Sequence, residues 1–92
     1  MESMELSRIR SMGIKATEDT LGMLEQYQKA IGNPDMSLRQ IESLARSLSQ
    51  GVSRLETMAE KVAPSDPLRK IMTDVGIVST VEIEKFNRGE YV

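Results

Sequence analysis

The stretch MSLRQIESLARSLSQGVSRLETMAEKV, residues 36–62, carries the most regular pattern of the chain. From Leu38 onward, apolar or small residues recur in alternating steps of three and four, which is the a/d spacing of a helix that packs along a seam. Leu44, Gly51 and Met58 widen this stripe, which is therefore typical of one helix of a bundle rather than of a two-stranded coiled coil. We predict an interaction face, called here the central stripe, that consists of Leu38, Ile41, Leu44, Ala45, Leu48, Val52, Leu55, Met58, Ala59 and Val62.

Local signals mark both ends of this helix. Ser37 and Gln40 have the spacing of a capping box, in which each side chain accepts a hydrogen bond from the other residue's backbone N–H. Pro64 cannot continue a helix. The sequence therefore predicts a helix over about 38–62, roughly 37 Å long at 1.5 Å per residue, and a helix of this length needs a partner along most of its face.

A second amphipathic helix is predicted before the central stripe, over about 18–31. Thr17 suits its N-cap, and Pro34 forbids its continuation. The short turn that follows favours an antiparallel neighbour. Residues 1–16 also have apolar residues at helical spacing, but Gly13 interrupts them. We therefore expect a weakly ordered N-terminal arm over 1–16 and a single helical domain over 17–92.

The C-terminal third has signals for one or two short helices. Asp66 or Ser65 can cap a helix that has Pro67 at its first position and ends at Gly76. A further helix over about 80–88 is favoured, with Gly89 as its stop. The residues from Val81 to Glu84 also alternate as a strand does, which leaves strand pairing with another protein as an alternative. The predicted fold class is all-α: an antiparallel hairpin of about 18–31 and 38–62 with one or two short C-terminal helices in a small bundle.

Composition argues against most chemistry. The chain has 92 residues with no cysteine, histidine or tryptophan, so the commonest proton shuttle and the sulfur and imidazole metal ligands are missing. Its formal net charge is only −2, with acidic and basic residues well mixed, which gives no field that would attract nucleic acid. Phosphate-binding loops and nucleophile–base pairs are not evident either. We expect no catalytic residues, no cofactor, no metal site and no nucleic-acid partner; a small enzyme is a distant alternative.

Targeting signals are equally sparse. No apolar stretch approaches the roughly 20 residues that span a bilayer, and the first residues lack the apolar region of a cleavable signal peptide. We expect a cytoplasmic protein, or one exported without such a peptide.

The seven methionines lie mostly on or beside the predicted apolar faces. Core filling explains them, and the alternative is an adaptable binding groove, since flexible thioethers suit such grooves.

Two local stretches resemble known proteins. The helix–turn–helix arrangement around 32–37, with its Asn-Pro-Asp turn, resembles the hairpin of small secretion-apparatus subunits that polymerise through long amphipathic helices. The C-terminal VEIEKFNRGEYV, residues 81–92, is similar to the regulatory C-terminal region of bacterial anti-sigma factors of the flagellar type. Neither likeness identifies a family, and no functional residues are carried over from either.

The expected function is non-catalytic: an assembly subunit, adaptor or small chaperone that works through an amphipathic helix face. The expected partners are further copies of this chain, another protein, or both, with self-association as the leading mechanism. The alternative is a regulatory protein-binding module that uses residues 77–92. Its candidate partner-binding residues are Val81, Ile83, Phe86 and Tyr91.

Overall fold

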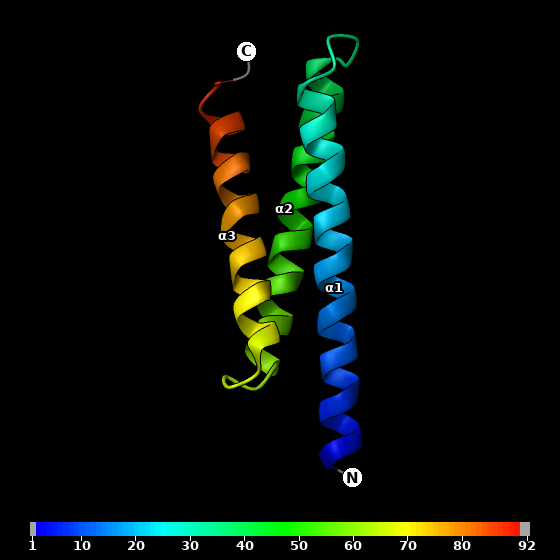
Figure 1. Ribbon diagram of the computed structural model, residues 1–92. Coiled ribbons are helices and arrows are strands. Elements are labelled where there is room, and N and C mark those ends of the chain that lie inside the picture. Colours follow the sequence, from blue (N-terminus) through cyan, green and yellow to red (C-terminus); the bar gives the residue numbers. More distant parts are fainter. Residues whose placement is uncertain (1, 91–92) are drawn as a thin grey trace.

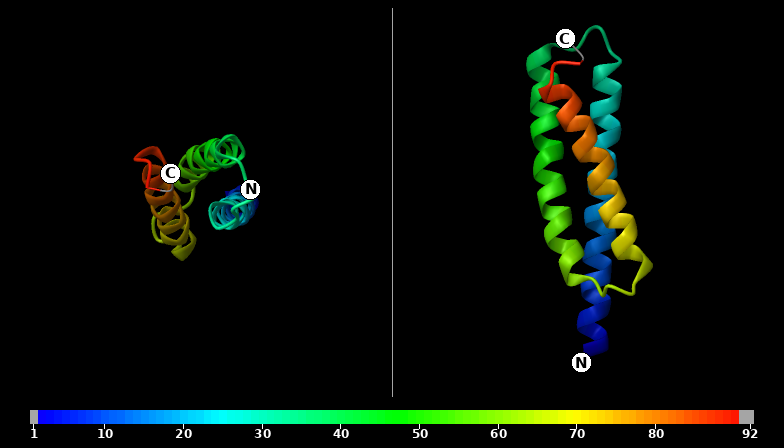
Figure 2. Two further views of the ribbon diagram at one scale, coloured as in Figure 1. Left: turned by 90° about the horizontal axis from the view of Figure 1, so that it is seen from above. Right: turned by 90° about the vertical axis from the view of Figure 1, so that its left-hand side faces the viewer.

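The computed structural model describes residues 2–90, and their side chains from Met4 onward. Within that range the protein is an all-α bundle of three helices without strands: α1 (Glu2–Ile31), α2 (Leu38–Lys61) and α3 (Pro67–Asn87). The helices lie side by side, and α2 runs in the opposite direction to both α1 and α3 (Figure 1). Seen end-on, the three helices stand at the corners of an open triangle, and α2 packs against both α1 and α3 (Figure 2). The bundle is elongated, with extents of 51 × 18 × 15 Å.

The start of α2 confirms the predicted capping box. The backbone N–H of Gln40 donates to the Ser37 hydroxyl at 3.1 Å, and the Ser37 N–H donates to the Gln40 side-chain oxygen at 2.8 Å. These two bonds satisfy backbone donors that the first turn of a helix leaves without partners. The first turn of α3 is capped by Asp66, whose carboxylate accepts from the Leu68 N–H at 2.9 Å, with Pro67 at the first helical position.

The structure corrects the predicted start of the first helix, because α1 begins at Glu2 and continues through Gly13 and Thr17. A Cβ on Gly13 would lie 3.3 Å from atoms of Leu68 and Met72, so the glycine allows α3 to approach α1 closely. Thr17 does not cap a helix; its buried hydroxyl donates to the Gly13 carbonyl at 2.7 Å. The N-terminal turns of α1 extend past the α2–α3 loop (Figure 1). The division into an arm over 1–16 and a domain over 17–92 stays a prediction.

The predicted end at Gly76 is wrong as well. One helix of 21 residues continues to Asn87, and both Gly76 and Ser79 are buried inside it. The helix predicted over about 80–88 is therefore the continuation of α3 and not a separate element. The strand alternative over 81–84 is also wrong, because these residues are helical. Gly89, predicted as a stop, follows the end of α3 with a φ of 77°, which glycine adopts without steric cost.

The core consists of two apolar clusters. Near the α2–α3 loop are Leu55, Ala59, Val62, Leu68 and Met72. Near the α1–α2 loop are Leu24, Tyr27, Ala45 and Leu48. Between them the buried residues are smaller or carry hydroxyl groups: Thr17, Thr20, Gly51, Gly76 and Ser79. The Tyr27 hydroxyl fixes the second cluster to α3 by donating to the Glu82 carbonyl at 3.2 Å, and its ring meets Phe86 edge-on.

Candidate interaction surfaces

The central stripe forms the wall of the core of its own chain. Its residues Ala45, Leu48, Val52, Leu55, Ala59 and Val62 are buried. Ile41, Leu44 and Met58 are half-buried, and Leu38 is 51% exposed at the end of α2. In this fold α1 and α3 therefore occupy most of the stripe. Its role as an interaction face between chains stays a prediction.

The candidate residues of the C-terminal segment lie in different environments. Val81 is exposed. Ile83 and Phe86 are half-buried and pack against the cluster of Leu24, Tyr27, Ala45 and Leu48. Tyr91 lies outside the described residues. Among the predicted partner-binding residues that the structure describes, Val81 alone is exposed and therefore free to contact another molecule.

Four large apolar residues of α3 are exposed: Ile71, Ile77, Val78 and Val81. Of these, Val81 was predicted from the sequence as a partner-binding residue. The sequence places Ile71 on a compact apolar face and Val78 as a hydrophobic staple to Ile83, and it assigns no role to Ile77. A signal was present: if 67–87 is read as one helix, its apolar residues cover more of the circumference than two neighbouring helices can bury. The expected break at Gly76 concealed this excess.

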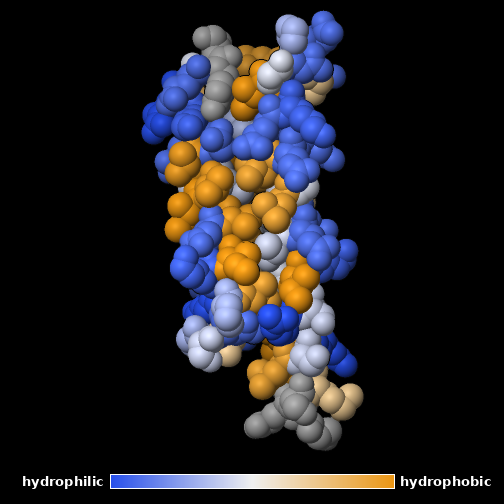
Figure 3. All heavy atoms as spheres, viewed as in Figure 1, coloured by the Kyte–Doolittle hydropathy of each residue, from blue (hydrophilic) through white to orange (hydrophobic). Residues whose placement is uncertain are grey.

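One group of exposed apolar residues lies along the side of α3 that borders α1. Ile71, Val75 and Val78 recur in steps of four and three, so they share one side of α3. On α1, Ile14 directly follows Gly13, which contacts α3, and Leu21 lies two turns further along the same side of the helix. Ile14 and Val75 both pack partly against the core, whereas Ile71, Val78 and Leu21 are exposed. We call these five residues the α1/α3 face. The side of the molecule that shows α1 and α3 has a continuous apolar area (Figure 3).

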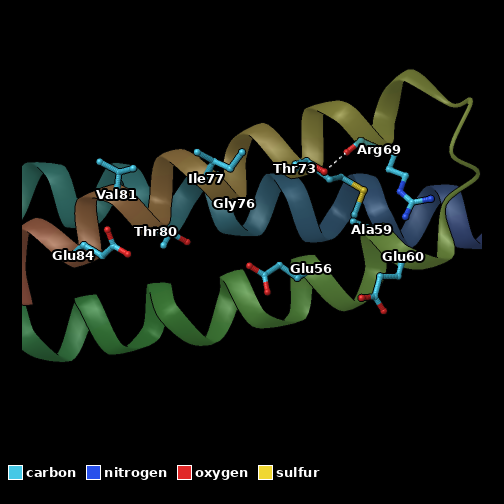
Figure 4. A pocket seen from close by; sticks show the side chains of 11 residues that line it. Glu56, Ala59, Glu60, Arg69, Thr73, Gly76, Ile77, Thr80, Val81 and Glu84 are labelled. Carbon is cyan, nitrogen blue, oxygen red and sulfur yellow. Dashed lines mark hydrogen bonds between the residues drawn. The ribbon is translucent and has the colours of Figure 1, made fainter.

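A groove lies on the other side of α3, between α3 and α2, with a volume of about 540 Å³. Ala59 and Met72 line it together with the exposed residues Ile77 and Val81. Glutamates from both helices line it too: Glu56 and Glu60 from α2 and Glu84 from α3. Figure 4 shows Glu84 towards one end, Glu60 and Arg69 towards the other, and Ile77 and Val81 along α3. We call this the α2/α3 groove.

A smaller groove of about 240 Å³ separates α1 from α2. Three methionines line it: Met12, Met23 and Met58. Its floor includes Gly51, where an added Cβ would lie only 3.0 Å from the Met23 sulfur. Here Met23 occupies the space that Gly51 leaves between α1 and α2, whereas Met72 is buried in the core. Core filling therefore accounts for Met72, and the use of the methionine-lined groove for binding stays a prediction.

The fold clearly changes the acidity of Asp66. The backbone N–H of Leu68 donates to its carboxylate, and Arg10 of α1 adds an ion pair with an Nε–Oδ2 distance of 3.0 Å. Both interactions favour the charged form, so the pKa of Asp66 lies below its ordinary value of 3.8 despite opposing desolvation. The carboxylate thus caps α3 and also ties its first turn to α1.

Within residues 2–90, no cluster of three or more acidic side chains could hold a metal ion. None of the three described helices combines the length and apolar character needed to cross a bilayer. No family model, curated protein or solved structure matches this chain. A function must therefore be argued from its surfaces.

Proposed function

We propose that this protein is a non-catalytic helical assembly subunit that self-associates through the α1/α3 face. The supporting observation is the exposure of Ile71 and Val78, which are 52% and 49% exposed although they lie beside Val75, which packs partly against the core. Leu21 extends the same apolar surface onto α1. Contiguous exposed apolar surface on a small protein is typical of an interaction site.

A second copy is the proposed occupant because a two-fold contact would pair this face with itself. In such a contact each Val78 meets the matching surface of the partner, and helices from both copies complete a larger bundle. A chain of 92 residues buries a smaller fraction of its surface than a larger domain does, so it gains more from such a contact. Adaptor and small-chaperone roles would use the same kind of surface to bind another protein.

Sedimentation equilibrium of Val78→Glu against wild type tests the proposal. Leu38→Glu is the matched control, because Leu38 is 51% exposed and Val78 49%, yet Leu38 lies outside the α1/α3 face. We expect wild type and Leu38→Glu to form the same dimer at micromolar concentration. Val78→Glu should raise the dimer dissociation constant more than about tenfold, since a two-fold contact would bury two unpaired carboxylates. Its melting temperature should stay close to that of wild type.

Two results would contradict this proposal. One is a wild-type protein that stays monomeric through the micromolar range. The other is a dimer that Val78→Glu leaves intact. If Leu38→Glu broke that dimer instead, the exposed end of the central stripe would be the interface.

A further inference from the structure

The α2/α3 groove combines an apolar surface with side chains of one charge. Ile77 and Val81, 57% and 43% exposed, stand one helical turn apart on α3. Between α2 and α3, the space next to Gly76 is open: a methyl group on its Cα would have no neighbour within 4 Å. The groove can therefore accept apolar side chains from outside without displacing any of its own.

The three glutamates of the groove have no ion pair or hydrogen bond to any described side chain. Elsewhere on the same helices, charges are paired four residues apart, as Glu42 is with Arg46 at 3.0 Å. Glu56 and Glu60 have this same spacing but like charge, which is unfavourable on a helix. Glu60 and Glu84 also lie in the last turns of α2 and α3, where the helix dipole disfavours negative charge.

The positions of these carboxylates are therefore electrostatically unfavourable within their own helices. Positive charge on a bound partner would reduce this repulsion. Arg69 offsets them only in part. Its guanidinium lies at the end of the groove near Glu60, where it donates to the Val62 carbonyl at 3.4 Å. With three glutamates and one arginine, the lining keeps a formal charge of −2.

We propose that the α2/α3 groove binds an amphipathic helix of another protein, with apolar residues along one face and lysine or arginine on both flanks. A helix is the fitting shape, because a fourth helix placed between α2 and α3 would pack in the manner of a four-helix bundle. The N-terminal turns of this chain are a poor match, since the exposed Leu6 lies between Glu5 and Arg8 and offers no net positive charge. The groove shares no residue with the α1/α3 face, so this inference does not depend on self-association.

Three synthetic helical peptides test the proposal on the full-length protein. All carry the same leucine and alanine face, and their flanks are lysine, glutamine or glutamate. Binding is measured by fluorescence anisotropy, and its location by NMR of labelled isoleucine and valine methyl groups. We expect the lysine peptide to bind more than about tenfold tighter than the glutamate peptide and to weaken as salt rises. The methyl signals of Ile77 and Val81 should shift, and that of Ile71 should not.

Variants with matched controls locate the binding further. The double change Glu56→Gln and Glu84→Gln should weaken the lysine peptide by about fivefold, since it removes two solvent-exposed ion pairs. The same charge change at Glu18 and Glu25, exposed on α1, should have no effect. Ile77→Asp should abolish binding, whereas Ile71→Asp should preserve it. Val78→Glu leaves the α2/α3 groove unchanged and should bind the lysine peptide like wild type. Peptide binding and dimer formation are therefore tested independently, and either proposal can fail without the other.

The inference is overturned if the three peptides bind equally well or if none binds. It is also overturned if the shifted methyl groups belong to the α1/α3 face, or if the control pair at Glu18 and Glu25 weakens binding as much as the groove pair does.

Discussion

The helices α2 and α3 are close in length, with 24 and 21 residues, yet they use their apolar side chains differently. On α2 the apolar residues form one stripe, and Leu48 and Leu55 are fully buried. On α3 they spread around the helix, and four large ones remain exposed. Because α2 lies between two neighbours and presents a single face to them, it can bury that face almost completely. The apolar surface of α3 exceeds what α1 and α2 can cover.

The two helices therefore have different roles: α2 mainly stabilises the fold, whereas α3 carries apolar surface that a partner can contact. The regular stripe of α2 explains how the chain folds, while the exposed apolar residues of the α1/α3 face and of the α2/α3 groove lie on α3 and at the neighbouring edge of α1. The most regular sequence pattern therefore indicates the core. The irregular pattern of α3 supplies the two surfaces proposed for partners.

The largest expected effect comes from placing the same charge on each helix. Leu48→Asp should destabilise the protein by several kcal/mol, because it buries a carboxylate without a partner and removes a fully buried leucine. Ile77→Asp should change the free energy of unfolding by less than about 1 kcal/mol, since its side chain is exposed. Urea unfolding followed by circular dichroism measures both. If the two variants lost similar amounts of unfolding free energy, the proposed difference between the buried stripe of α2 and the exposed residues of α3 would be contradicted.

A smaller effect concerns how each helix begins. The cap of α2 is neutral, with Ser37 and Gln40, whereas the cap of α3 is the carboxylate of Asp66. Because the pKa of Asp66 is lowered in the folded protein, its contribution to stability is fully present above its ordinary value of 3.8. That contribution is lost as the pH falls through the lower, folded-state pKa.

Asp66→Asn isolates this contribution, because asparagine can still cap α3 but carries no charge. At neutral pH the variant should be less stable than wild type, with the difference shrinking as the pH falls below about 4. Urea unfolding at a series of pH values measures it. A difference that stayed constant with pH would show that the charge of Asp66 does not stabilise the docking of α3. Ser37→Ala serves as the control, since its effect should not vary with pH.

Much of the fold was predictable from local chemistry. The boundaries of α2 follow from Ser37, Gln40 and Pro64, and the start of α3 follows from Asp66 and Pro67, because these residues act within one turn of their own position. The predicted breaks at Gly13 and Gly76 were wrong because a glycine weakens a helix only locally, and the packing of the bundle holds both helices continuous through it. The two environments differ, since Gly13 lies against α3 whereas Gly76 borders the open α2/α3 groove. The exposure of Ile77 and Val78 likewise depends on tertiary packing, because it is set by which sides of α3 the neighbouring helices cover.

The most direct test of this account is one NMR measurement on wild-type protein with labelled methyl groups and a soluble paramagnetic agent, at low and at high protein concentration. At low concentration the agent should broaden Ile71, Ile77, Val78 and Val81 strongly and leave Leu48 and Leu55 sharp. At high concentration Ile71 and Val78 should become protected while Leu48 and Leu55 stay unchanged. Broadening of Leu48 and Leu55 in the dilute sample would contradict the account, because the stripe of α2 would then need a second chain to be buried.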